Sequence, residues 1–269
     1  MHIEDGDFFR LCEYMRTRFG INLEKKKTLI EGRLASAIVE QGYTGFHDYI
    51  DAALRSPDGE LVNTLVTNLT TNYTYFMREE AHYKFMMQSA LPALTAAVSD
   101  NDLRIWSAGC ASGEEAYTLA MLLSEYFGPA KAAWDTTLLA TDISPKVLEI
   151  ARYGVYAETH LKGLSPALKA KYFRQVSQEE WQVTESIRKE VLFNQFNLMG
   201  DFSRFRRKFH IIFCRNVMIY FNTETKAALA KKFYDALCRG GYLFVGLSET
   251  LSGVSRDFRQ VAPSIYVKE

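Results

Sequence analysis

The chain has 269 residues, enough for one large or two small domains with a buried core. Its 32 basic and 32 acidic side chains cancel, which disfavours a nucleic acid as the main partner because such proteins normally carry a net basic charge. The cysteines form no CxxC pair and the histidines show no metal-ligand spacing, so we expect reduced thiols and no metal site. No signal peptide opens the chain and no apolar run approaches membrane-spanning length, which predicts a cytoplasmic protein without direct membrane insertion.

Residues 1–88 are predicted to form an all-helical domain and a linker. Apolar residues recur at three- and four-residue steps through the first 56 residues. The second predicted helix starts near Glu24 and carries Lys26 and Arg33 seven residues apart on one side. A charged face of this kind is most often a solvated surface.

A polar elbow follows at residues 67–86, after a turn predicted at Ser56-Pro57-Asp58-Gly59 and a further helix. Threonine and asparagine are dense in the elbow, and both prefer helix caps and turns to helix interiors. A helix is predicted to restart near Arg78. Such an elbow could close over a ligand or could be a capped turn between helices.

Strands and helices alternate from Leu103 onward, which predicts an α/β domain over residues 89–269. The predicted strands are 103–107, 138–141, 191–196, 209–213 and 242–247, and the clearest helices are 114–127 and 223–237. Residues 155–190 break the alternation. This segment is too long for a bare loop, so we expect a small inserted subdomain there.

The stretch Leu103–Tyr117, LRIWSAGCASGEEAY, is typical of a strand, a glycine loop and a helix that present backbone N–H groups to a ligand. Gly109 and Gly113 give GxxxG spacing, and the loop lacks the lysine of a P-loop. Glu114 and Glu115 would repel a pyrophosphate but can accept hydrogen bonds from hydroxyls or an ammonium group. The combination favours a cationic, ribose-bearing ligand such as S-adenosylmethionine, whereas the bland alternative is two glutamates that only favour a helix start.

Asp142 ends the second predicted strand, where nucleotide-binding sheets hold a ribose diol. The alternative for Asp142 is a simple turn residue.

Five segments in register make the chain resemble the chemotaxis-receptor glutamate methyltransferases, the CheR family. They are NYTYFMR at 72–78, WSAGCASGEEAYTLA at 106–120, ATDIS at 140–144, FNL at 196–198 and FCRNVMIYF at 213–221. The resemblance implies a Rossmann-like S-adenosylmethionine methyltransferase domain with a small inserted β subdomain. It further implies an enzyme that converts glutamates on the cytoplasmic helices of transmembrane chemoreceptors to methyl esters, releases S-adenosyl-L-homocysteine and tunes chemosensory adaptation.

The resemblance also implies site residues at the matching positions. Arg78 and Tyr220 would lie at the reacting carboxylate, and Glu115 and Asp142 would hold the ammonium and ribose groups of the cofactor. The other implied cofactor-binding residues are Asn72, Thr74, Arg78, Gly109, Asn197, Leu198, Arg215, Asn216 and Val217. Lys26 and Arg33 would contact the receptor, because their helix resembles the family's receptor-contacting helix.

Elementary chemistry agrees with these implied roles. A glutamate carboxylate is already ionised at neutral pH, so methyl transfer to it needs no general base. Catalysis then reduces to excluding water and to alignment, which can supply roughly 7–11 kcal/mol. Arg78 can hold one carboxylate with a bidentate fork, and the phenol of Tyr220 can orient it. Asn197 and Arg215 each follow a predicted strand directly, so we expect them at the same sheet edge as Asp142.

Several positions depart from the family pattern. Met77 and Ala116 stand where the family commonly has an aromatic residue and a proline, which predicts altered packing and not lost chemistry. Ser36 replaces a frequent arginine of the receptor-contacting helix. Residues 174–186 contain no glycine, although members that tether to a receptor's C-terminal pentapeptide carry a glycine-rich loop there, so we expect tether-independent binding.

Two other function classes remain open. A nucleic-acid methyltransferase is disfavoured by the charge balance and by residues 214–217, CRNV, which contain neither a Pro-Cys pair nor a proline pair with an aromatic. A non-catalytic cofactor-binding signalling module would bind the cofactor without turnover. A monomer is the default expectation.

Overall fold

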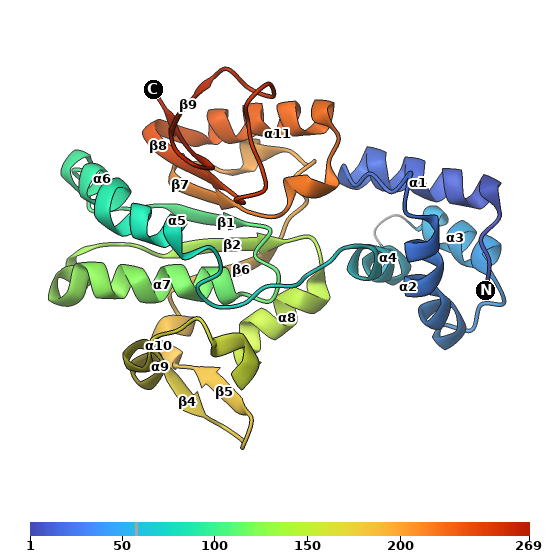
Figure 1. The fold of residues 1–269 in the computed structure, drawn as a ribbon, viewed down its shortest axis with the longest axis horizontal. Helices are drawn as coiled ribbons and strands as arrows, with labels where there is room; N and C mark the ends of the chain where they lie inside the picture. The colour runs from blue at the N-terminus through green and yellow to red at the C-terminus, as the bar shows by residue number, and fades with distance from the viewer. Residues whose placement is uncertain (57–58) are drawn as a thin grey trace.

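The computed structural model describes residues 1–56 and 59–269, so the centre of the turn predicted at residues 56–59 lies outside the described part of the chain. Figure 1 shows a helical body at the N-terminus beside a larger body built on a mainly parallel sheet. This arrangement confirms the predicted α/β class with a leading all-helical domain. Within the two described ranges, no helix combines the length and the hydropathy that a membrane crossing requires.

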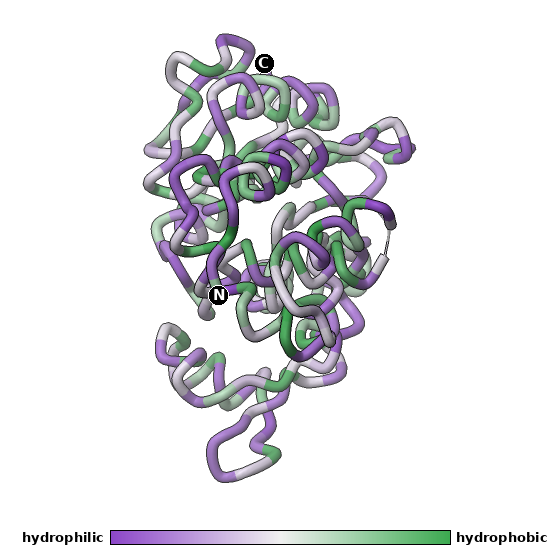
Figure 2. The backbone as a smooth tube through the Cα atoms, turned by 90° about the vertical axis from the view of Figure 1, so that its right-hand side faces the viewer, coloured by the Kyte–Doolittle hydropathy of each residue, from purple (hydrophilic) through white to green (hydrophobic). Residues whose placement is uncertain are grey.

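The helical domain follows the apolar periodicity of its sequence. Its helices are α1 (Asp5–Phe19), α2 (Lys27–Glu40), α3 (Phe46–Arg55) and α4 (Glu60–Leu69). Each buries its recurring apolar residues, such as Phe8 and Leu11 in α1, and Figure 2, which looks onto this domain, shows apolar and polar stretches alternating along the chain. Helix α2 begins at Lys27 and not near Glu24, so Lys26 precedes the helix.

The large sheet has the strand order β6-β2-β1-β7-β8-β10-β9. Its strands are β1 (Ile105–Ala108), β2 (Leu138–Asp142), β6 (Val191–Gln195), β7 (Phe209–Cys214), β8 (Leu237–Val245), β9 (Phe258–Ala262) and β10 (Ile265–Lys268). The neighbouring strands β6, β2, β1, β7 and β8 pair in parallel, and β10 and β9 complete the sheet in antiparallel pairing. Ile105 is in register with Leu138 on one side and Ile211 on the other. Chain order reverses at β1, so the carboxyl ends of β1, β2 and β7 form the edge where an open α/β sheet leaves a crevice.

Helices cover both faces of this sheet (Figure 1). They are α5 (Glu80–Phe85), the π-helical turn η1 (Met86–Ala90), α6 (Leu91–Ala97), α7 (Glu114–Phe127), α8 (Pro145–Tyr153) and α11 (Thr223–Ala236), with 3-10 turns η2 (Gly128–Ala133), η4 (Phe202–Arg204) and η5 (Met218–Tyr220). Successive strand residues point to opposite faces. Ile105 therefore packs with Leu119 of α7, whereas Trp106 packs with Phe233 of α11 in a core that continues into the helical domain. This shared core joins the two bodies.

Residues 155–190 form the inserted subdomain that was predicted. It contains β3 (Val155–Ala157), η3 (Glu158–Leu161), α9 (Pro166–Tyr172), β4 (Phe173–Gln175), β5 (Glu180–Val183) and α10 (Glu185–Arg188), with an antiparallel sheet in the order β3-β5-β4. The subdomain contacts the interdomain linker through Phe76. The Phe76 ring packs edge to face against the rings of Tyr156 and Phe173, with centroids 5.0 and 5.1 Å apart. The backbone N–H of Phe76 donates to the His160 carbonyl.

The linker at residues 70–79 runs from α4 to α5 across the carboxyl edge of the sheet (Figure 1). Two of its residues, Met77 and Glu79, have positive φ angles of 63° and 58°. Helix α5 then begins at Glu80, close to the restart predicted near Arg78.

Candidate active site

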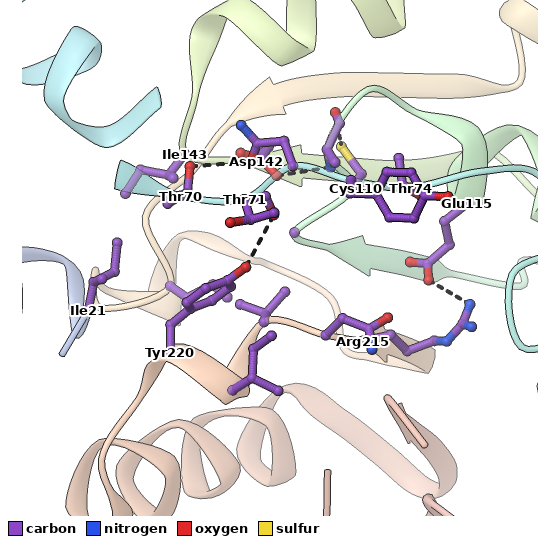
Figure 3. Close-up of a pocket in the computed structure, with 18 of the residues that line it drawn as sticks. Ile21, Thr70, Thr71, Thr74, Cys110, Glu115, Asp142, Ile143, Arg215 and Tyr220 are labelled. Carbon is purple, nitrogen blue, oxygen red and sulfur yellow. Dashed lines mark hydrogen bonds and ion pairs between the residues drawn. The ribbon is translucent and has the colours of Figure 1, made fainter. Parts of the chain in front are cut away.

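A cavity of about 250 Å³ lies between the linker and the carboxyl ends of β1, β2 and β7 (Figure 3). It is lined by Phe19, Ile21, Thr70, Thr71, Asn72, Tyr73, Thr74, Tyr75, Arg78, Tyr83, Gly109, Cys110, Ala111, Glu115, Asp142, Ile143, Phe196, Asn197, Leu198, Arg215, Asn216, Val217, Ile219, Tyr220 and Phe221. Both domains therefore contribute to its wall. Every residue to which the family resemblance gives a role in cofactor binding, and both residues that it places at the reacting carboxylate, line this one cavity.

The glycine loop after β1 passes close to the loop after β7. The N–H groups of Gly109 and Cys110 both donate to the Thr141 carbonyl, at 2.7 and 2.9 Å, which folds the loop back over β2. Gly109 has a φ of +91°, and a Cβ placed on it would lie 2.4 Å from Cγ2 of Val217. Only glycine fits this position without displacing the side chain of Val217.

The two consecutive glutamates of α7 have different surroundings. Glu115 faces the cavity, where its carboxylate accepts hydrogen bonds from the Ser107 hydroxyl at 2.7 Å and from Arg215 at 3.0 Å. Glu114 is fully buried on another side of the helix, where it contacts Nδ1 of His160 at 2.7 Å. That contact raises the pKa of His160. Of the two carboxylates predicted at the cavity, only Glu115 lines it.

Asp142 closes the end of β2 and also faces the cavity. Its Oδ2 accepts the N–H of Ala111 at 2.9 Å, and its Oδ1 accepts the N–H of Ser144 at 3.0 Å. Burial raises the pKa of this carboxyl group. Each carboxylate oxygen keeps a further lone pair, so Asp142 shapes the turn, as the simpler alternative expected, and can still accept hydrogen bonds from a ligand.

Arg215 holds the cavity wall from behind. Only 2% of its side-chain surface is exposed, and its five N–H donors all have protein acceptors. These acceptors are the carboxylates of Glu79 and Glu115, the hydroxyl of Tyr83 and the carbonyl of Arg78. Arg215 therefore has no donor left for a ligand, and it acts by fixing Glu115 in place.

Two glutamates that sequence reasoning missed organise the loop after β7. Glu79 accepts hydrogen bonds from the side chain of Asn216 at 3.2 Å and from the N–H of Leu247 at 3.1 Å. Glu249, buried after β8, accepts the N–H groups of Asn216 at 2.8 Å and Ile219 at 3.1 Å, and burial raises its pKa. The one signal in the sequence was position, since Glu79 adjoins Arg78 and Glu249 follows a predicted strand.

Arg78 and Tyr220 line the cavity from two different segments, the linker and η5. Arg78 lies on the linker, and one of its Nη1 protons goes to the Tyr73 carbonyl at 2.8 Å. Its other N–H donors have no hydrogen-bond acceptor among the described residues. Tyr220, at the end of η5, donates its phenol proton to the Thr71 carbonyl at 3.2 Å, as Figure 3 shows.

The remaining predicted residues divide into two groups. Asn72, Thr74 and Leu198 line the cavity, as does Asn197, whose side chain joins the Arg18 carbonyl to the Met199 N–H. Lys26 and Arg33 lie outside the cavity lining. Lys26 is exposed ahead of α2, and Arg33 binds the start of the linker.

Cavity chemistry suits an organic cation with hydroxyl groups. Carboxylates at Glu115 and Asp142 provide acceptors, the bare backbone at Gly109 allows close approach, and Phe196 and Leu198 provide apolar contact. Cys110 also lines the cavity, but burial raises the pKa of its thiol well above the usual value. It therefore stays protonated and is a poor nucleophile.

Comparison with known proteins agrees with this chemistry. The family model for the all-alpha domain of CheR methyltransferases matches residues 6–70, and the model for their SAM-binding domain matches residues 72–267. A chemotaxis protein methyltransferase of Borreliella burgdorferi is 41% identical over all of this chain and 96% of its own length. Chemotaxis protein methyltransferase 1 of Pseudomonas aeruginosa is 33% identical over 97% of this chain and 96% of its own length. The chemotaxis protein methyltransferase of Escherichia coli is 32% identical, covering 98% and 91%.

Proposed function

Because this chain belongs to the CheR methyltransferase family, we propose that it is a protein-glutamate O-methyltransferase whose substrates are the cytoplasmic helices of chemoreceptors. The chain is a methyltransferase with S-adenosylmethionine as its cofactor. The glutamate acceptor, the receptor partner and the site roles below are our proposals. We expect the enzyme to act in the cytoplasm as a monomer.

The residues present fit this cofactor. Glu115 would hold its ammonium group and Asp142 its ribose hydroxyls, because both carboxylates line the cavity with acceptor capacity to spare. Phe196, Leu198 and Val217 would flank the adenine. When bound, the cofactor supplies an electrophilic methyl group carried on a sulfonium.

Arg78 is the group that would bind the acceptor carboxylate. It lines the cavity, and apart from the donor that binds the Tyr73 carbonyl its N–H groups have no acceptor among the described residues. Guanidinium donors pair with carboxylates in a bidentate geometry. The phenol proton of Tyr220 is directed at Thr71, so Tyr220 would support the acceptor through its ring and its oxygen and would remove no proton. A carboxylate needs no base at neutral pH, and the protonated Cys110 does not compete as nucleophile.

A single observation carries this proposal: Arg78, with uncommitted donors, shares one cavity with the carboxylates of Glu115 and Asp142. Arg78→Lys replaces a planar fork with a single nitrogen, and losing one charge-assisted hydrogen bond costs about 1.5–3 kcal/mol. Methyl transfer to receptor-containing membranes should therefore fall about 10- to 100-fold. The exposed Arg256 provides the matched control, Arg256→Lys, which should leave the rate unchanged.

Radiolabelled transfer to such membranes, followed by alkaline treatment, tests the chemistry. Glutamyl methyl esters release methanol in base, whereas methylated amines and bases do not. Label that resists alkali, or an Arg78→Lys enzyme that is as fast as the wild type, would refute the proposal. Cofactor binding without any transfer would support the non-catalytic alternative.

We also propose that receptor binding is independent of a C-terminal pentapeptide tether. The β4–β5 connection contains no glycine and folds into a short hairpin, in which the N–H of Val176 donates to the Glu180 carbonyl at 3.0 Å. Calorimetric titration with the pentapeptide should give no heat of binding. Tight binding would overturn this assignment.

A further inference from the structure

Arg33, on α2, binds the beginning of the interdomain linker. Its Nη1 donates to the carbonyls of Thr70 at 2.9 Å and Asn68 at 3.2 Å, and its Nη2 donates to the Thr71 hydroxyl at 2.9 Å. These carbonyls belong to the C-terminal end of α4, where helix geometry leaves carbonyls without intrahelical donors and where a positive charge is favourable. The guanidinium thus joins two helices of the N-terminal domain to the first residues of the linker.

Thr71 of the linker also contacts Tyr220. The Thr71 carbonyl accepts the Tyr220 phenol at 3.2 Å, and both Thr70 and Thr71 line the cavity. The backbone carbonyl of Tyr220 in turn accepts the N–H of Asn22 at 2.9 Å, which also belongs to the N-terminal domain. Both the phenol and the carbonyl of Tyr220 are therefore held by segments that the helical domain positions.

We propose that Arg33 is a positioning residue of the active site and not a contact for the substrate. It fixes the Thr70–Thr71 backbone, which forms one wall of the cofactor cavity and orients the phenol of Tyr220. This inference rests on the proposed function for the part played by Tyr220, but its effect on the cofactor cavity does not. It replaces the receptor-binding role that the family resemblance implied for Arg33.

The linker depends on this contact because it has little structure of its own. Residues 70–75 lie in neither helix nor strand, so their backbone is held by side-chain contacts and by packing. A lysine at position 33 would keep the charge, but one nitrogen on a flexible stem cannot replace two nitrogens in a planar fork that reaches three acceptors. Lys26 differs in each respect, since it is exposed and precedes the helix, and its ammonium group has no hydrogen-bond or ion-pair partner among the described residues.

Binding of S-adenosylhomocysteine to the full-length protein without receptor separates the two roles. Arg33→Ala should weaken this affinity by about tenfold, since hydrogen bonds to a charged group that order the cavity wall are lost. Arg33→Lys should recover only part of the loss. Lys26→Ala, the matched control, should bind S-adenosylhomocysteine as the wild type does. Thermal unfolding followed by circular dichroism verifies that each variant is folded.

Kinetics with receptor membranes complete the test. We expect Arg33→Ala to lower kcat with little change in the KM for receptor, and we expect its effect on kcat to be non-additive with that of Tyr220→Phe. If Arg33→Ala binds S-adenosylhomocysteine normally and only the KM for receptor rises, Arg33 is a substrate contact and the inference is wrong. Should Arg33→Ala not fold, normal affinity in Arg33→Lys would overturn the inference equally. Loss of S-adenosylhomocysteine affinity would stand even if the methylated group were not glutamate.

Discussion

Replacing Gly109 with alanine tests whether the two loops at the cavity fit as closely as the structure indicates. The residue has a φ of +91°, and its missing Cβ would lie 2.4 Å from Cγ2 of Val217. Two separate penalties therefore apply. The backbone conformation is unfavourable for any residue with a side chain, and the added methyl group overlaps a neighbour.

The size of each penalty follows from the geometry. A non-glycine residue held in a sparsely populated conformation with positive φ costs about 1–3 kcal/mol. Inserting a methyl group into packed surroundings costs about 1–3 kcal/mol more. Gly109→Ala should therefore lower the free energy of unfolding by about 2–6 kcal/mol. Because Val217 belongs to the loop that carries Tyr220, its displacement should also weaken binding of S-adenosylhomocysteine.

Gly42 provides a control for the backbone penalty alone. It has a similar φ of +80°, but a Cβ placed on it has nothing within 4 Å. Urea unfolding of Gly42→Ala should therefore show only the backbone penalty of about 1–3 kcal/mol, with cofactor binding unchanged. In the Gly109→Ala background, Val217→Ala removes the overlapping atom and should restore part of the stability. The reasoning is refuted if Gly109→Ala and Gly42→Ala are equally destabilised, or if Val217→Ala restores nothing.

Three further predictions concern buried carboxylates. Glu249→Gln should lower the free energy of unfolding in urea by about 1–3 kcal/mol, because its amide NH₂ would face backbone N–H donors. Glu40 is exposed, so Glu40→Gln should leave the stability unchanged, and equal effects of the two substitutions would contradict this role of Glu249. His160 has its pKa raised by Glu114, so the stability it contributes is complete below its ordinary value of 6.5 and is lost as the pH rises through the raised value. The stability difference between wild type and His160→Gln should accordingly shrink on going from acid to alkaline pH, and a difference that grows would be inconsistent. Protonation of Asp142, whose pKa is raised by burial, should weaken S-adenosylhomocysteine binding as the pH falls, starting at a higher pH than for an ordinary aspartate; calorimetry of Asp142→Asn should show this pH dependence removed.

Sequence reasoning located the cavity because its residues obey a rule of topology. Asp142 is the last residue of β2, Asn197 lies two residues after β6, and Arg215 follows β7 directly. The carboxyl ends of parallel strands meet at one edge of the sheet. The linker residues were found differently, through the order of the motifs, since nothing local to residues 72–78 shows that they cross the sheet. Their position depends on contacts with the inserted subdomain, such as that between Phe76 and Phe173.

The directions of side chains could not be predicted from the sequence. Glu114 and Glu115 are neighbours on α7, but consecutive residues of a helix point about 100° apart, so one faces a histidine and the other the cavity. Glu79 was missed because its partners, Arg215 and Asn216, lie 136 and 137 residues away. Glu249 was missed because it accepts hydrogen bonds from the backbone N–H groups of Asn216, Gly246 and Ile219. Every residue except proline has such a group, so no sequence pattern marks it.

A cavity wall shared between two domains makes any occupant a mechanical link between them. Phe19 and Ile21 reach it from the helical domain, and Gly109 and Asp142 reach it from the sheet. A ligand present at a hundred times its dissociation constant stabilises the bound state by about 2.7 kcal/mol, and here that gain is spread over both domains. Amide hydrogen exchange should therefore slow in α1 when the cofactor binds, although most of that helix lies outside the cavity lining.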